Sequence, residues 1–408
     1  MRLIFAILLG KLIAYFTRIL KIGGGSAAPG LFALKIDPDL VKKLSSKISQ
    51  NIVITGTNGK TTTAKMLAHF AKASGLKVIR NHTGSNLERG IASTLILRSH
   101  LTSGKLEKLD YDLGIWELDE AAFNSIAPKL KPKAVVILNL SRDQLDRYGE
   151  TDKIVNDWCQ TLKKLSPDTN LLINKDDKNL AKLKFCFGGK MLKFGLPANI
   201  KLNGLNGSIF QFTVHSSQFT VNLPLPGVYH IYDTVAALTT ANALRMPINS
   251  CIESLKTFNP AFGRVEKLPF GYIFLIKNPA GATQVFETIA PNIKPLDRLL
   301  LALNNNLADG TDVSWIWDAG FERLQVTGYR LQVIASGTRA HDLALRLKYA
   351  GFDPKQIIIE PDLKKALEQA REGLKGRLFI LPTYTAMLEL QSILTKSGIK
   401  KHYWKEDA

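Results

Sequence analysis

Residues 52–63 have the sequence IVITGTNGKTTT, and this stretch decides the fold. An apolar β run ends at Thr55, and a short loop then leads into a helix. Glycines in such a loop let backbone N–H groups approach phosphate oxygens, and the N-terminus of the following helix favours an anion. Lys60 is expected at the β and γ phosphates, and the hydroxyl of Thr61 or Thr62 at Mg²⁺. The predicted nucleotide-binding residues are Gly56, Thr57, Asn58, Gly59, Lys60, Thr61 and Thr62.

Apolar runs alternate with helix-length segments around this loop. Strands are expected at residues 51–55, 77–80, 113–118, 134–140 and 170–173. Strands separated by helices form a parallel sheet that is covered on both faces. The predicted fold class is therefore α/β.

The pattern of apolar and polar residues changes after this series of strands and helices. Residues 191–225 hold short alternating stretches with Asn, Gly and Ser between them, which indicate a small β insertion or a sheet edge, and a helix is expected after Gly227. A second alternating series begins near Gly263. A chain of 408 residues suits two or three domains. We predict an N-terminal helical segment over residues 1–50, a nucleotide-binding domain over 51–260 and a second α/β domain over 261–408.

Composition narrows the class of protein. Fifty-four Lys and Arg against 35 Asp and Glu give a net charge of +19, which favours nucleotides, nucleic acid or anionic lipid headgroups without choosing among them. Three cysteines are too few for a disulfide framework, so a reducing compartment is expected. Cys159 and Cys251 lie in helical contexts typical of small core residues, and none of the three has the surroundings of a nucleophile.

The first twenty residues are nearly all apolar, but Lys11 and Arg18 interrupt them two helical turns apart. Charges at this spacing are costly in hydrocarbon and natural on an amphipathic helix. We expect a helix that packs on the protein or lies on a bilayer surface. Packing without any lipid and a true membrane anchor are the alternatives.

Acidic and amide side chains follow two of the expected strands. Glu117 ends one strand and is followed by Asp119 and Glu120, while Asn139 ends the next strand. Because ligands bind at the carboxyl ends of strands in an open α/β sheet, Glu117 is predicted to bind Mg²⁺ with Thr61, and Asn139 to contact the nucleotide. Asp119 and Glu120 are interpreted as a solvated acidic turn.

The order of these motifs resembles the central ATPase domain of the Mur ligases, which activate a carboxylate as an acyl phosphate. TGTNGKTTT at 55–63, the acid-ending strand, NLSRDQLDRYGE at 139–150 and LLINKDD at 171–177 carry this resemblance. GRVE at 263–266, KNPAG at 277–281, LALNNNLADGTDVSWIWD at 301–318, SGTRAHDLALRLKYAG at 336–351 and PTYT at 382–385 resemble the MurT family, the synthetase subunits of lipid II isoglutaminyl synthase. The resemblance implies a Mur ligase central domain followed by a C-terminal Rossmann-like Mur ligase domain.

The resemblance also implies an activity and a partner. With ATP and Mg²⁺, the chain would amidate the α-carboxylate of D-glutamate in the lipid II stem peptide. The ammonia would come from a GatD-type glutaminase. Arg264 and Lys60 would stabilise the transferred phosphoryl group. Asp312 would lend its carboxylate to the glutaminase, with Asp309 and Asp318 in reserve; a helix-capping role is the alternative for Asp312. The implied location is the cytoplasm, peripherally at the inner face of the membrane, with lipid II rather than nucleic acid as the macromolecular ligand.

The chain departs from the family pattern at three places. His230 and Asp233 are predicted at the nucleotide, where they replace the paired asparagines that contact adenine in the family, and Gln144 replaces a histidine that binds a second metal ion. The four-cysteine zinc ribbon is missing, so no zinc is predicted. Two other functions stay open: a Mur-type amino-acid ligase that acts without a partner, and a non-catalytic nucleotide-binding module that uses its charge on nucleic acid or membrane.

Overall fold

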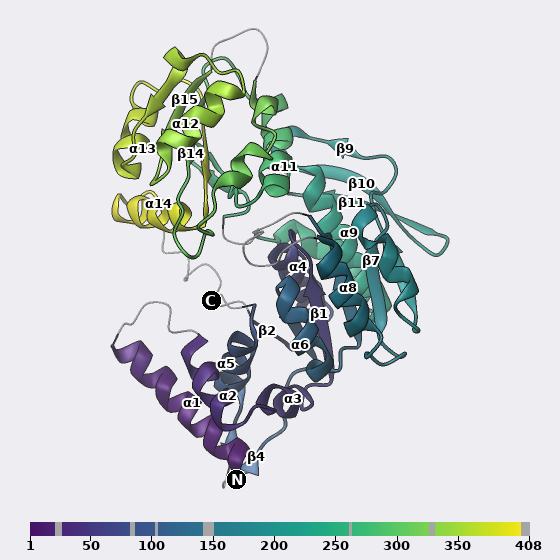
Figure 1. Cartoon of the computed structure of the whole chain (residues 1–408). Coiled ribbons are helices and arrows are strands. Elements are labelled where there is room, and N and C mark those ends of the chain that lie inside the picture. Colours follow the sequence, from purple (N-terminus) through teal and green to yellow (C-terminus); the bar gives the residue numbers. More distant parts are fainter. Residues whose placement is uncertain are drawn as a thin grey trace.

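The computed structural model describes residues 1–20, 27–81, 86–102, 105–141, 151–260, 263–325 and 331–400. Its first sheet has six parallel strands in the order β2-β5-β1-β6-β7-β8, with β1 (Gln50–Thr55) between β5 (Leu113–Glu117) and β6 (Ala134–Ile137) (Figure 1). Most side chains of these strands are β-branched or otherwise apolar, which suits a sheet buried on both sides. The others are β2 (Val78–Arg80), β7 (Asn170–Asn174) and β8 (Met191–Phe194).

Helices cover both faces of this sheet, because alternate residues of β1 point to opposite sides. Val53 belongs to the core shared with α3 (Leu40–Ser45), α5 (Glu88–Arg98), α6 (Glu120–Leu130) and α8 (Thr151–Leu162). Ile52 and Ile54 belong to the core shared with α4 (Lys60–Ala73), α9 (Val228–Ala243) and α10 (Ile248–Ser254). The α/β prediction is confirmed.

An N-terminal hairpin of α1 (Arg2–Ile19) and α2 (Ala28–Ile36) packs on α5. Close packing relies on glycine: a Cβ on Gly30 would lie 2.0 Å from the backbone oxygen of Arg89. Lys11 donates to the backbone oxygen of Ser99 at the end of α5. Lys11, one of the two charges that interrupt the apolar run, is thus turned toward a helix C-terminus, which attracts cations.

The predicted insertion is smaller than expected. Residues 201–223 form an antiparallel three-stranded sheet of β9 (Lys201–Leu202), β10 (Ser208–Val214) and β11 (Ser217–Leu223). Residues 191–194 instead pair with β7 as the edge strand β8 of the first sheet. Two further short strands, β3 (Leu101–Thr102) and β4 (Lys105–Leu106), form a separate hairpin.

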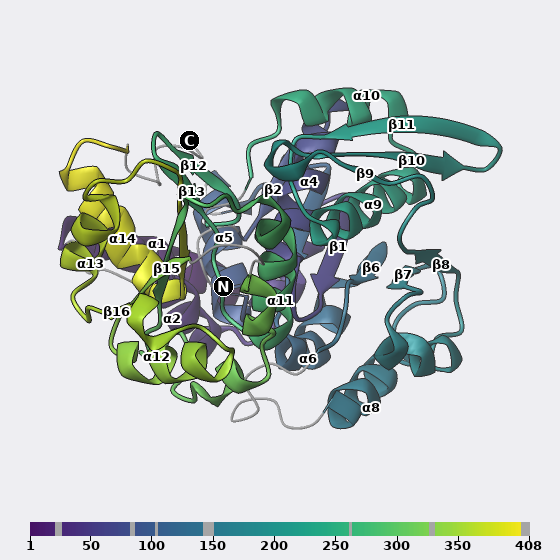
Figure 2. The ribbon, with the colours of Figure 1, turned by 90° about the horizontal axis from the view of Figure 1, so that it is seen from above.

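A second six-stranded sheet follows in the order β12-β13-β17-β14-β15-β16, with only β12 antiparallel to its neighbour. Two helices cover each face, and α11 lies between this sheet and the first domain (Figure 2). The strands are β12 (Glu266–Leu268), β13 (Gly271–Ile273), β14 (Arg298–Ala302), β15 (Gln332–Ser336), β16 (Ile357–Ile359) and β17 (Leu378–Pro382); the helices are α11 (Pro279–Ile289), α12 (Ala340–Tyr349), α13 (Leu363–Arg371) and α14 (Tyr384–Lys396).

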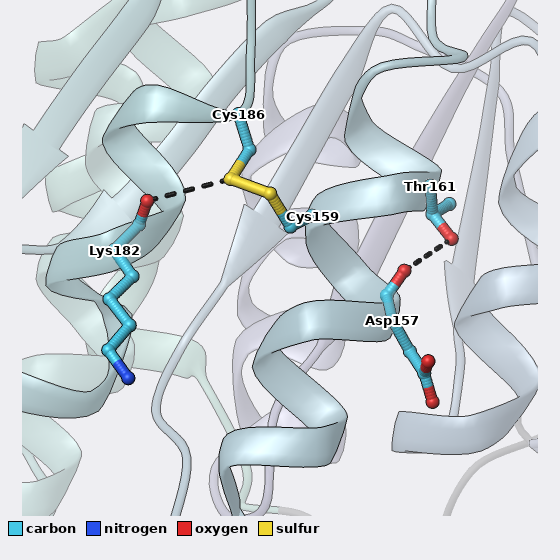
Figure 3. Close-up of a disulfide and its surroundings, with 5 residues drawn as sticks. All are labelled: Asp157, Cys159, Thr161, Lys182 and Cys186. Carbon is cyan, nitrogen blue, oxygen red and sulfur yellow. Dashed lines mark hydrogen bonds between the residues drawn. A yellow bond between two sulfur atoms is a disulfide. The ribbon is translucent and has the colours of Figure 1, made fainter.

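A disulfide joins Cys159 of α8 to Cys186, which ends the 3-10 helix Lys178–Phe185 (Figure 3). The interpretation of Cys159 as an unpaired core residue was wrong. The two cysteines are 27 residues apart, and only the packing of α8 against the 3-10 helix brings their Cα atoms to 5.1 Å. Disulfides are uncommon in reducing compartments, so this pair also departs from the redox expectation. Cys251 is free and buried, as expected.

Candidate active site

The predicted phosphate-binding loop lies between the carboxyl end of β1 and the N-terminus of α4. Gly56 and Gly59 have φ values of +134° and +85°, which strain any residue with a Cβ. At Gly59 a Cβ would also lie 2.1 Å from Oδ1 of Asp233. The loop therefore requires glycine at both positions. The backbone N–H groups in the first turn of α4 have no partner within the helix, and they point toward this loop.

Asn139 holds this loop from the neighbouring strand. Its Oδ1 accepts from the backbone N–H of Asn58 at 2.8 Å, and its Nδ2 donates to the backbone oxygen of Asn58 at 3.0 Å. The backbone oxygen of Asn139 accepts from the N–H of Thr57 at 3.1 Å. Asn139 is thus a positioning residue for the loop as well as part of the cavity wall described below.

Lys60 is buried within the loop and lies beside two acids. Its Nζ donates to the backbone oxygens of Gly56 and Thr57, and lies 3.5 Å from Oε2 of Glu120 and 3.9 Å from Oδ1 of Asp119. Glu120 is only 4% exposed, so its assignment to a solvated turn was wrong. Burial at the start of α6 beside a lysine makes Glu120 a partner of the phosphate-binding cation.

Glu117 and Thr61 come together as predicted for a metal site. The Thr61 hydroxyl donates to Oε2 of Glu117 at 2.7 Å, while Asn81 bonds both backbone groups of Glu117. Burial raises the pKa of the Glu117 carboxyl, and the Thr61 hydrogen bond and the charges of Arg80, Lys60 and Arg264 oppose this rise. Two hard oxygen donors, one of them a desolvated carboxylate, suit Mg²⁺ with the remaining positions left to water and phosphate. Thr61 and Glu117 would therefore hold it.

Glu117→Gln is expected to raise the Mg²⁺ concentration for half-maximal ATP turnover by about tenfold or more, because it removes the charge and keeps an acceptor for Thr61. Titration of ATP hydrolysis with Mg²⁺ measures this. Glu253→Gln, on the exposed side of α10, is the control. An unchanged Mg²⁺ dependence in Glu117→Gln would exclude this carboxylate as a ligand. Elemental analysis of the same protein is expected to find no stoichiometric zinc.

A cavity of about 430 Å³ joins the loop to the second domain. Asn58 of the loop exchanges hydrogen bonds with Asn278, which caps α11 by accepting from the N–H of Gly281. This pair fixes the start of α11 directly opposite the phosphate-binding loop. The cavity is lined on the first-domain side by Asn58, Gly59, Thr62, Asn139, Asp176, Tyr229, Tyr232 and Asp233, and on the second-domain side by Arg264, Lys277 and Gly281.

Arg264 is held at this cavity by an anchored turn. Glu266 accepts from the N–H of Gly263 at 2.7 Å and from Nε2 of Gln391 at 2.7 Å, and the backbone oxygen of Gly263 accepts from Leu275 at 2.8 Å. The charge of Arg264 is close enough to influence the pKa values of Glu117 and Asp233. Lys60 and Arg264 therefore bring positive charge to Glu117 from two domains, and Arg264 also lines the cavity.

Asp233 and His230, the two residues of α9 that depart from the family pattern, lie in different surroundings. Asp233 lines the cavity against Gly59, and burial raises the pKa of its carboxyl to about 8 although Arg264 opposes this. His230 is fully buried, its Nδ1 is 2.7 Å from the backbone oxygen of Pro226, and burial lowers its pKa to about 4. Tyr229 and Tyr232, rather than His230, present the aromatic rings of this helix to the cavity. Contact of adenine with His230 thus lacks support from the geometry.

Asp233→Asn is expected to raise thermal stability more at pH 8 than at pH 5. A carboxyl with a raised folded-state pKa keeps a proton that the unfolded chain releases, so its contribution to stability falls from about pH 4 to about pH 8. Asparagine removes that slope, and we expect the Tm difference from wild type to grow by at least about 4 °C between the two pH values. Asp168→Asn, at an exposed position, is the control. An equal Tm difference at both pH values would contradict the raised pKa.

Asp312 lies on the exposed loop after β14, at the carboxyl edge of the second sheet. Its Oδ1 and Oδ2 accept from the N–H and hydroxyl of Ser314 at 2.8 and 2.9 Å, so the capping role that sequence analysis left open is present. Asp309 is buried and accepts from the N–H and hydroxyl of Thr385. Asp309 is thus committed to its own loop, while the Asp312 carboxylate lies at the surface.

Three residues of the site carried no assigned role in the sequence: Glu120, Asn278 and Asn81. The acids after the strand were visible in the sequence, but nothing local showed that Glu120 is buried beside Lys60. The Asn58–Asn278 pair joins positions 220 residues apart and has no local signal either. Residues 142–150, which include Gln144, lie outside the described part of the chain.

A six-stranded parallel sheet with a glycine loop facing a second α/β domain across a cavity defines a Mur-ligase-like protein. The Mur ligase middle domain family matches residues 54–241, and the MurT ligase C-terminal family matches residues 275–387. MurF from Acinetobacter baumannii superposes with a TM-score of 0.70 at 16% identity, over 89% of this chain and 79% of that chain. Folylpolyglutamate synthase from Mycobacterium tuberculosis, in complex with ADP, gives 0.67 at 16% identity, over 89% and 93%.

A curated relative extends this likeness to nearly the whole chain. The lipid II isoglutaminyl synthase (glutamine-hydrolyzing) subunit MurT of Streptococcus pneumoniae R6 is 30% identical over 93% of this chain and 94% of its own length. The chain belongs to the MurT family, and it is a ligase subunit.

Proposed function

We propose that this chain amidates the α-carboxylate of D-glutamate in the lipid II stem peptide to D-isoglutamine, using ATP and ammonia. The observation that carries the proposal is that Lys60 and Arg264, from two domains, both act on Glu117, beside a cavity that is lined by the phosphate-binding loop and by Arg264. The name of the pneumococcal relative supports the substrate and the product.

The reaction needs two transfers. A substrate carboxylate oxygen attacks the γ phosphorus of ATP, the bond to the β–γ bridging oxygen breaks, and ADP leaves with that electron pair. Ammonia then attacks the acyl carbon, inorganic phosphate leaves, and the nitrogen loses a proton to give the amide. Lys60 and Arg264 oppose the negative charge that spreads over the transferred phosphoryl oxygens.

ATP and Mg²⁺ are part of the proposal. The mycobacterial synthase that shares this fold is in complex with ADP, and the loop from Gly56 to Thr62 has the glycines and the helix N-terminus that suit a phosphate group. When bound, Mg²⁺ would neutralise phosphate oxygens beside Thr61 and Glu117. Tyr229, Tyr232 and Asp233 form the wall available to the nucleoside end of the cavity.

The nitrogen has to come from another subunit. Glutaminases release ammonia with a nucleophilic cysteine, and here Cys159 and Cys186 are bonded together while Cys251 is buried. We infer a GatD-type glutaminase partner that docks near Asp312. Exposed apolar side chains on the same domain support such a contact: Leu307 is 79%, Trp317 49% and Tyr349 69% exposed. We place the complex in the cytoplasm, at the inner face of the membrane where lipid II is available.

Reconstitution with the glutaminase, ATP, Mg²⁺ and lipid II tests this function. We expect glutamine-dependent ADP release and incorporation of the amide nitrogen, and isotopically labelled ammonium should replace glutamine when the glutaminase is omitted. Transfer of a labelled amino acid without a partner would show an amino-acid ligase instead. Nucleotide binding without substrate-dependent hydrolysis would show a non-catalytic module.

A further inference from the structure

The outer side of α1 is a continuous apolar surface. Its residues recur at helical spacing, each is between 51% and 61% exposed, and we call them the apolar stripe: Phe5, Leu8, Leu12, Tyr15, Phe16 and Ile19. Leu31 and Phe32 of α2, the other helix of the hairpin, are also exposed, at 40% and 44%. A contiguous apolar surface of this kind marks a binding site on a protein that folds in water.

The orientation of α1 is fixed by its inner side. Ala6, Ile7 and Ala14 are buried in the hairpin and against α5, and a Cβ on Gly10 would lie 2.9 Å from Cδ1 of Ile96. Lys11, the cation in the middle of the helix, donates to the backbone oxygen of Ser99 on this inner side. Small residues and the central lysine thus face the protein, and the large apolar residues are exposed. Figure 1 shows α1 at the outer edge of the molecule, with α2 and α5 to one side of it.

Charge identifies the occupant. The first 36 residues contain Arg2, Lys11, Arg18, Lys21 and Lys35 and no Asp or Glu. Arg18 of α1 and Lys35 of α2 are exposed, and Nζ of Lys35 lies 5.5 Å from the ring centre of Phe32. In a symmetric contact between two copies these cations would approach one another without any acid to pair with. Lipid phosphates in an anionic bilayer supply the missing charge.

We propose that the α1–α2 hairpin docks on an anionic bilayer, with α1 lying parallel to the membrane, the apolar stripe among the acyl chains, and Arg18 and Lys35 at the lipid phosphates. Aromatic and aliphatic residues beside cations are typical of interfacial helices. Among the described residues no helix is long and apolar enough to cross a membrane. The proposal deepens the proposed function, because a lipid-linked substrate lies in the same plane.

Vesicle co-sedimentation of the full chain tests the proposal without ATP or substrate. We expect binding to vesicles of equal parts phosphatidylglycerol and phosphatidylcholine, and at least about tenfold weaker binding to phosphatidylcholine alone. Leu12→Glu and Phe16→Glu are each expected to weaken binding by about tenfold or more, because they place a charge in the acyl region. Leu345→Glu makes the same change at a leucine that is 48% exposed on α12, and should bind like wild type.

Both stripe residues are about half exposed, so the variants should fold; thermal unfolding and ATP binding equal to wild type check this. Equal vesicle binding by wild type and both stripe variants would overturn the proposal, as would no binding by wild type. Dimerisation or glutaminase binding that Leu12→Glu abolishes, with no vesicle binding, would assign the stripe to a protein and also overturn it. Vesicle binding and ATP turnover are measured separately. A chain that fails to bind vesicles but keeps its ATP turnover would therefore contradict the membrane proposal and leave the proposed function standing.

Discussion

Lys60→Ala should lower kcat for ATP turnover by at least about two orders of magnitude. The Lys60 ammonium is buried within the phosphate-binding loop, and the variant removes the charge that neutralises the β and γ phosphates. The methylene groups of the side chain fill little of the core, so stability should change far less than turnover. The ADP-release rate at saturating substrate measures the effect.

Lys72→Ala is the matched control, because Lys72 lies on the exposed last turn of the same helix. It should keep wild-type kcat and unfold near the wild-type temperature. One further consequence is testable: Glu120 and Asp119 lose their nearby cation in Lys60→Ala, so Lys60→Ala/Glu120→Gln should be more stable than Lys60→Ala. Wild-type turnover in Lys60→Ala would remove the loop from the active site.

Asp312→Asn should reduce glutamine hydrolysis by the partner subunit by at least about a hundredfold. A cysteine and histidine pair needs a carboxylate that holds the imidazole in one tautomer and stabilises its protonated form. Asparagine keeps an acceptor for Ser314, so the loop should survive while the charge is lost. Added ammonia should restore amidation in part, because the step on this chain is intact.

Two controls separate this role from a structural one. Asp342→Asn removes an exposed carboxylate that pairs with Arg339 on the same domain and should leave glutamine hydrolysis unchanged. Ser314→Ala breaks the contacts of the Ser314 hydroxyl with Asp312 and should have a small effect. Complex formation, followed by gel filtration, should be normal in all three variants. Unchanged glutamine hydrolysis by the Asp312→Asn complex would refute the assignment, and loss of ATP binding would place Asp312 at the nucleotide.

The strands of both sheets were predictable because their signal is local. Residues 113–118 were predicted within one residue of β5, and residues 170–173 within one residue of β7. A run of β-branched and apolar side chains between turn residues favours the extended backbone wherever it lies in the chain. The order of the strands in each sheet was not predictable in the same way, since β1 pairs with strands that begin 63 and 84 residues later.

The residues of the candidate site also divide into those that the sequence predicted and those that it did not. The loop and the pair of Thr61 with Glu117 followed from residue types at the ends of predicted strands, and Arg264 followed from the family resemblance. The structure joins Thr61 to Glu117 and brings the charge of Arg264 near Glu117. The contact of Glu120 with Lys60 did not follow, because an acid after a strand is equally common on the surface. His230 was assigned to the nucleotide by its position in a family motif. The orientation of α9 instead places His230 in the core and Tyr232 at the cavity.

The sequence by itself determined the fold class, the family and the phosphate-binding loop, because periodicity and motif spacing are properties of neighbouring residues. Tertiary structure alone decided that Cys159 meets Cys186, that Asn58 meets Asn278, and that the apolar side of α1 faces outward. Each of these depends on which faces of distant elements pack together. A helix with apolar residues on two sides has no local feature that selects the buried one; here the small residues of α1 allow close packing on α5, and the large ones are left at the surface.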